Sequence, residues 1–153
     1  MTTESRAQIQ FQSSQSQSSL LRTTLRTNAV FSIISGGLMI LASAGIAAFL
    51  GIADATILGF LSGSSFILVL GIGVLLFGLG VLYDVTRPEF SRLYATAILV
   101  GDIVWVVASA ILLLTHALPL STAGNWTVLI VADIVTVFAI AEYIGLRRLS
   151  RNI

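Results

Sequence analysis

Residues 101–110 read Gly-Asp-Ile-Val-Trp-Val-Val-Ala-Ser-Ala, and they place the carboxyl group of Asp102 in the middle of an apolar run without a basic residue. A near-copy, Asp-Ile-Val-Thr-Val-Phe-Ala-Ile-Ala at residues 133–141, puts Asp133 in similar surroundings. Acidic side chains are rare in membrane-spanning helices, and those that occur serve a specific contact or function. The similarity of the two stretches indicates either a duplicated helical hairpin or chance in a chain rich in valine, isoleucine and alanine.

The composition points to a membrane protein. Of the 153 residues, 56% are hydrophobic and only 10% are charged, whereas about a quarter of a soluble domain is charged. The chain contains neither cysteine nor lysine and has a single histidine, which excludes disulfides, thiolate metal sites, lysine Schiff bases and bis-histidine haem ligation. A net charge of +1 without a basic patch gives no reason to expect nucleic acid as a partner. We expect no metal and no cofactor.

Four apolar runs are long enough to cross the ~30 Å hydrocarbon core of a bilayer at 1.5 Å per helical residue. We predict helices at about residues 28–50, 64–83, 93–115 and 125–146. Their short connections predict antiparallel neighbours, and hence an all-α four-helix transmembrane bundle within residues 27–148. The apolar piece at residues 57–61 predicts either an extension of the second helix or a segment in the membrane interface.

The two ends of the chain differ from this apolar middle. Residues 1–26 are rich in serine and glutamine and predict a disordered tail, because such a segment buries too little apolar surface to offset its ordering entropy. Its last part, residues 20–26, interleaves leucine with arginine and favours either a short helix on the membrane surface or a simple positive flank. Residues 149–153 form a short basic C-terminal tail.

The arginines indicate the orientation. All eight basic residues are arginines, and they precede the first run, separate the second from the third, or follow the fourth. They are Arg6, Arg22, Arg26, Arg87, Arg92, Arg147, Arg148 and Arg151. In a four-helix topology all of them lie on one side, and positive residues stay in the cytoplasm. We therefore expect both termini in the cytoplasm and the chain in a bacterial inner membrane. The layout resembles small four-helix membrane proteins of bacteria.

Small residues on the first two runs predict close helix packing. The second run carries two glycine pairs at spacing seven, Gly71 with Gly78 and Gly73 with Gly80, and the first run has Gly36 four residues after Ser32. Because lipid tails are as apolar as leucine, helices in a membrane associate through close packing at such positions. The same residues would also suit contact with a second copy or a partner subunit.

Polar side chains on the first run predict the surroundings of Asp102. Asn28, Ser32 and Ser35 lie along roughly one side of this helix and need polar partners inside the bundle. Counted from the cytoplasmic side, Asp102 reaches nearly the depth of Ser35, so we expect it to contact Ser35 or Ser32. Trp105 and Ser109 share the face of Asp102 and are expected to point inward with it.

Two further acids belong to the fourth run. Asp133 lies near the middle of the membrane, and we expect it to point into the bundle. Glu142 lies closer to the cytoplasmic end, with Arg26, Asn28 or Arg92 as its expected partner. Because desolvation disfavours a charge without a counter-ion, at least one of Asp102 and Asp133 is expected to be protonated at neutral pH. The sequence leaves open whether Asp102 binds a proton for function or fixes helix register.

The sequence offers little enzymatic machinery. It contains no nucleophile–base pair and no phosphate-binding glycine loop, and Leu99-Val100-Gly101-Asp102 lacks the first glycine of the Gly-x-Gly-Asp motif of intramembrane aspartyl proteases. We therefore predict a non-enzymatic accessory or interaction subunit in the lipid bilayer, as a homo-oligomer or within a larger membrane complex. The alternative is a small oligomeric proton-linked transporter or channel that uses Asp102. A membrane-embedded enzyme acting on lipid is a minor alternative.

Overall fold

The computed structural model describes residues 3–87 and 92–149, and the side chains of residues 21–87 and 92–148. Within these ranges the chain forms five helices: α1 (Thr3–Leu41), α2 (Ser43–Leu50), α3 (Gly63–Thr86), α4 (Arg92–Thr115) and α5 (Thr122–Leu149). A two-stranded antiparallel hairpin, β1 (Thr56–Ile57) with β2 (Leu61–Ser62), precedes α3. The predicted all-α class is confirmed. The apolar piece at residues 57–61 belongs to this hairpin, with Ile57 paired to Leu61 and residues 58–60 in the turn, and it does not extend α3.

Four helical segments of the described chain are long and apolar enough to cross a membrane. They are Leu21–Leu41, Gly63–Thr86, Arg92–Thr115 and Thr122–Arg148. The last three agree with the predicted runs to within a few residues at each end. The chain thus has the helices of a multi-pass membrane protein.

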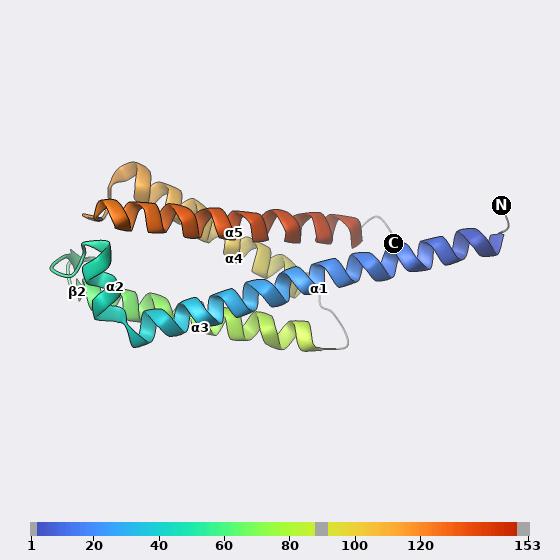
Figure 1. Cartoon of the computed structure of the whole chain (residues 1–153), viewed down its shortest axis with the longest axis horizontal. Helices are drawn as coiled ribbons and strands as arrows, with labels where there is room; N and C mark the ends of the chain where they lie inside the picture. The colour runs from blue at the N-terminus through green and yellow to red at the C-terminus, as the bar shows by residue number, and fades with distance from the viewer. Residues whose placement is uncertain (1–2, 88–91, 150–153) are drawn as a thin grey trace.

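The first span differs from the predicted range of residues 28–50. Helix α1 ends at Leu41, and after the non-helical Ala42 the chain turns into α2, as Figure 1 shows. Gly51 ends α2 in the left-handed conformation at φ +83°, and the Leu50 carbonyl accepts a hydrogen bond from the backbone N–H of Ser121. Contacts between distant parts of the chain thus hold the end of α2, and the continuous hydropathy of residues 28–50 gave no indication of them.

The structure also differs from the predicted disordered tail at residues 1–26. From Thr3 onward this segment belongs to α1 and continues the spanning part as a single helix. Residues 3–35 contain no glycine or proline, and a helix that is already nucleated gains one hydrogen bond for each residue added. Leu21 and Leu25 are buried, so the leucine–arginine segment starts the first span and is not a separate surface helix. Of the predicted C-terminal tail, residues 150–153 lie outside the described residues.

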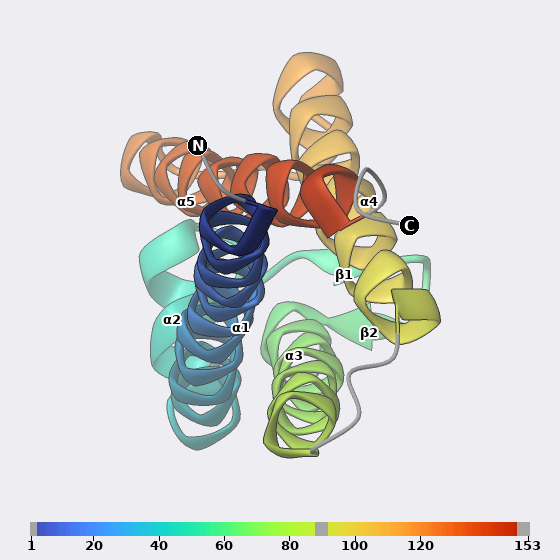
Figure 2. The same ribbon diagram turned by 90° about the vertical axis from the view of Figure 1, so that its right-hand side faces the viewer.

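The helices pack as two antiparallel pairs. Helix α1 lies along α3, α4 lies against α5, and the contact of α1 with α5 joins the pairs (Figure 1). Figure 2, viewed from the end where α1 begins, shows α4 crossing α5. The first turns of α1 and the last turns of α5 lie at one end of the molecule, and α2 and the hairpin lie at the other.

The core has two parts. At the end where α1 begins, buried residues from all four spanning helices meet: Leu21, Leu25, Ala29, Val81, Val85, Ala95, Ile98, Leu99, Ala139 and Leu146. At the opposite end, α2, the hairpin and α3 bury a smaller cluster of Ala47, Leu50, Ile52, Ile57 and Ile67. The first cluster surrounds the polar residues described in the next subsection.

Glycines bring α1 and α3 into backbone contact. A Cβ atom added to Gly78 would lie 2.9 Å from a backbone nitrogen of α1, and one added to Gly36 would lie 2.5 Å from a backbone nitrogen of α3. Gly71 faces the same interface. Gly73 has nothing within 4 Å of its added Cβ, and the nearest atom to that of Gly80 is a tyrosine hydroxyl at 3.4 Å. One predicted glycine pair therefore lines the helix contact, and the other pair faces away from it.

This contact predicts different effects for two glycines of the same helix. Gly78→Ala should lower the free energy of unfolding by roughly 1–3 kcal/mol, because the α1 backbone must move to admit the methyl group. Gly73→Ala should be neutral or gain up to about 1 kcal/mol from helix propensity. Thermal unfolding of both variants in detergent measures the difference. Equal effects of the two substitutions on the free energy of unfolding would contradict the close approach of the α1 and α3 backbones at Gly78.

Candidate functional site

The side-chain amide of Asn28 links three helices. Its Nδ2 donates one hydrogen bond to Oδ2 of Asp102 on α4 at 2.7 Å and another to Oε1 of Glu142 on α5 at 2.9 Å. A primary amide has two N–H donors, and both are used here. The hydroxyl of Ser32, one turn further along α1, donates a longer bond of 3.4 Å to Oδ1 of Asn28. We refer to Asn28, Ser32, Asp102 and Glu142 as the Asn28 cluster.

The Asn28 cluster is enclosed by the protein. The exposed fractions of Asn28, Asp102 and Glu142 are 1%, 4% and 0%, and Ser32 is also buried. Measured along each helix at 1.5 Å per residue, these four residues lie about 9 to 17 Å inward from the arginine-bearing ends of their spans. The cluster therefore lies inside the apolar spans, in the half nearer their arginine-bearing ends.

Helical spacing turns each polar residue of the cluster inward. Asp102 follows the buried Ile98 and Leu99 by four and three residues, and Glu142 follows the buried Ala139 by three. Residues three or four positions apart lie on one face of a helix. Each helix thus carries one acid or amide in a stripe that otherwise packs as core, and helix packing brings these groups together.

The charges in the Asn28 cluster are unbalanced. No arginine hydrogen-bonds either acid in the described part of the chain, and the second oxygen of Glu142, Oε2, has no hydrogen-bond partner there. Two carboxylates that share one amide in an apolar interior repel each other and lose their hydration. When at least one of the two acids is neutral, the repulsion between the carboxylates is removed and the amide of Asn28 donates to both acids.

The structure changes the partner predicted for Asp102. We expected Ser32 or Ser35, whereas Asn28 is the donor, Ser32 only supports Asn28, and Ser35 is half-buried outside the network. The reason is the start of the first span at Leu21, which moves Asn28 inward to the depth of the acid. Glu142 meets Asn28, one of its three predicted partners.

The prediction that Asp133 points into the bundle is wrong. Its side chain is exposed, while Ala132 and Val135 beside it are buried against the rest of the protein. The contacts of α5 centre on the face of these two residues, and Asp133 lies on the opposite side of the helix. On α4, Ser109 is buried as expected, and Trp105 is half-buried with its Nε1 lacking a hydrogen-bond partner among the described residues.

Sequence reasoning missed a further buried acid, Asp84, in the last turn of α3. It is 4% exposed and lies within electrostatic range of Arg22 and Arg87. Its position three residues before Arg87 is the available signal, and that pattern is also typical of an ordinary helix end. Asp84 is therefore an acid at the arginine-bearing end that lies separate from the Asn28 cluster.

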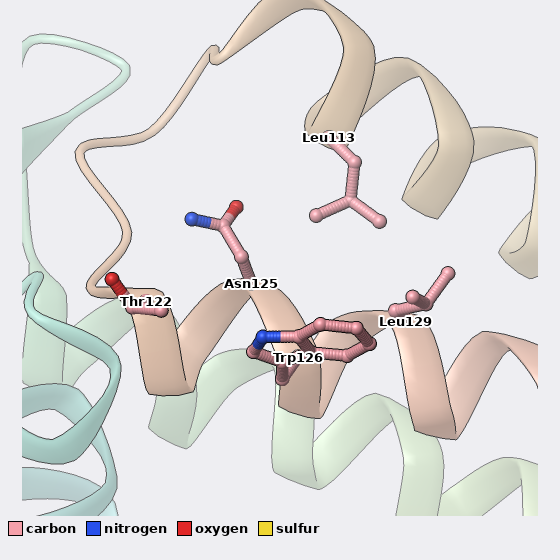
Figure 3. A pocket seen from close by; sticks show the side chains of 5 residues that line it. All are labelled: Leu113, Thr122, Asn125, Trp126 and Leu129. Carbon is pink, nitrogen blue, oxygen red and sulfur yellow. The ribbon is translucent and has the colours of Figure 1, made fainter.

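Two shallow cavities lie away from the Asn28 cluster. One, of about 230 Å³, lies between α4 and α5 at the end opposite the arginines and is lined by Leu113, Thr122, Asn125, Trp126 and Leu129 (Figure 3). The other is lined by Tyr143, Ile144, Arg147 and Arg148. Among the residues that the structure describes, no three histidine, aspartate or glutamate side chains come together as a metal site. The Asn28 cluster is thus the main concentration of chemistry in the described chain.

Comparisons with known proteins add no assignment. No protein-family model, curated protein or solved structure matches the chain.

The Asn28 cluster predicts a large effect from removing its donor. Asn28→Leu should lower the free energy of unfolding by roughly 2–4 kcal/mol, because both acids lose their N–H donor while staying buried. Ser35→Ala, on the same helix outside the network, should change it by less than about 0.5 kcal/mol. Chemical or thermal unfolding in detergent gives both values.

A triple variant separates the hydrogen bonds from simple packing. With Asp102→Leu and Glu142→Leu added to Asn28→Leu, stability should recover, because a dry apolar core replaces unpaired polar groups. Failure of the triple variant to exceed Asn28→Leu alone would mean that the two acids do not depend on Asn28.

Proposed function

We propose that this chain is a non-enzymatic accessory or interaction subunit of a membrane, in which the Asn28 cluster fixes how α1 meets α4 and α5. The observation that carries the proposal is the donation of both amide hydrogens of Asn28 to acids on two other helices, with all three groups buried. A polar contact of this kind specifies one register of otherwise similar apolar helices. It supports a structural role for Asp102 and Glu142.

The surroundings of the acids support the same proposal. The two described cavities are lined by other residues and touch neither Asp102 nor Glu142. Leu25, Ile98, Ala139 and Leu146 belong to the hydrophobic cluster of the same region. Acids enclosed in this way suit a permanent contact between helices.

The proposed location is the bacterial inner membrane, with both termini in the cytoplasm. Four candidate spans bring the chain back to its starting side, and the described arginines belong to the loop and helix ends of that side. The excess of positive charge on cytoplasmic segments supports this orientation.

A second candidate function is a small proton-linked transporter or channel that uses Asp102. It is favoured by one observation: among the described residues, two carboxyl groups lie against one amide with no arginine bonded to them, and one oxygen of Glu142 has no hydrogen-bond partner. Such a pair can hold a proton and release it when the helices separate. Four helices are few for a complete pathway, so this function would require several copies.

Proton flux in reconstituted vesicles distinguishes the two functions. The accessory role predicts that vesicles with the wild-type chain, with Asp102→Asn and with the loop control Asp54→Asn show equally low pH-driven flux. Asp102→Asn keeps an oxygen acceptor for the Asn28 amide, so the folded chain is retained and thermal unfolding verifies this. Flux in the wild type and in Asp54→Asn that is lost in a stable Asp102→Asn variant would contradict the accessory role.

A further inference from the structure

Asp133 is an acid on the outside of the protein at mid-membrane depth. Its side chain is exposed, and it lies 11 residues after the start of its span, Thr122–Arg148, and 15 before its end. At 1.5 Å per residue these distances are about 17 and 22 Å, which places the carboxyl group close to the middle of the hydrocarbon core.

Asp133 interrupts an exposed apolar stripe along α5. We call this the outer stripe; its members alternate at spacings of four and three and are Trp126, Ile130, Asp133, Val137, Ile140, Ile144 and Arg147. The opposite face of α5 carries the buried Ala132, Val135 and Ala139. The four–three spacing is that of a seam between two helices that cross at a small angle.

Lipid suits the apolar members of the outer stripe but not its acid. The other exposed charged side chains of the described chain lie in loops or within a few residues of a span end: Arg26, Asp54, Arg87, Arg92, Arg147 and Arg148. Charged side chains at mid-membrane depth almost always face protein or water, because hydrocarbon offers no hydrogen bond. The position of Asp133 therefore calls for a polar group from outside this chain.

We propose that the outer stripe is the contact between two copies of this chain and that Asp133 pairs with the partner's Asp133 across a two-fold axis along the membrane normal. In such a symmetric contact each residue near the axis meets its own copy. Two carboxyl groups that hold one proton between them form a strong O–H···O hydrogen bond, and a single polar pair within an apolar seam fixes register.

The charges of this chain favour a pair of acids between two copies over a salt bridge between them. The described arginines lie near the same ends of the spans, far from the depth of Asp133, so a copy offers an acid and not a cation. Arg147 of the stripe lies at the membrane surface, where water and lipid phosphate separate it from its copy. This inference rests on the proposed interaction role and gives it a surface.

Oligomeric state in nanodiscs or mild detergent tests the proposal. We expect a dimer for the wild type and for Asp133→Asn, whose amides can pair across the axis. We expect the dissociation constant of Asp133→Leu to rise by about tenfold or more. The chain has no native cysteine, so Ile130→Cys and Ile140→Cys report the stripe by disulfide formation between copies. Val104→Cys, exposed on α4, is the matched control and should not cross-link.

Three results would overturn the proposal. They are a monomeric wild type, a dimer that Asp133→Leu leaves unchanged, and cross-linking at Val104→Cys that equals the stripe positions. A monomer that binds a synthetic polyleucine helix with a central arginine, but not one with a central leucine, would assign the stripe to a basic partner instead. Proton flux of the Asp133→Leu variant is measured in parallel. Low flux without a dimer would contradict the dimer contact and leave the accessory role intact.

Discussion

One amide group forms side-chain hydrogen bonds from α1 to both α4 and α5. Helix α1 packs along α3 and α4 packs against α5, and the side chain of Asn28 reaches from the first pair to acids on both members of the second. In lipid the hydrophobic effect does not favour one apolar contact over another, so polar bonds and close packing decide which helices meet. The Asn28 cluster supplies the polar bonds, and the glycines of α1 and α3 supply the close packing.

The two devices work at different places and constrain each other. Gly36, Gly71 and Gly78 set the distance between the α1 and α3 backbones, and Asn28 lies on α1 toward the arginine-bearing end. With α1 packed on α3, the Asn28 amide donates to Asp102 on α4 and to Glu142 on α5, which joins both helices to that pair. Substituting Asn28 leaves both acids buried without this donor, and substituting either acid leaves one amide hydrogen of Asn28 without its acceptor, which makes the arrangement specific.

The sequence predicted four spans and the approximate bounds of the last three, because hydropathy and helix length determine them. It did not reveal the break at Ala42, since the hydropathy of residues 28–50 is continuous across that position and the end of α2 is bonded to Ser121, far along the chain. The polar stripe of α1 and the inward face of Asp102 were correct, but a misplaced start of the first span led to a serine as the partner. Asp133 was placed on the wrong side of α5, because its face depends on how α5 sits against α1 and α4, which no single helix encodes.

The contact between the Asn28 side-chain nitrogen and the two carboxyl carbons tests the account most directly. Solid-state NMR of the chain in lipid bilayers, with ¹⁵N-labelled asparagine and ¹³C-labelled aspartate and glutamate, measures both dipolar couplings in one sample. The account predicts that the nitrogen of Asn28 couples to carboxyl carbons of Asp102 and Glu142 at roughly 4 Å, with at least one of the two acids at the chemical shift of a neutral carboxyl group. Coupling to neither acid, or two fully ionised carboxylates, would contradict it.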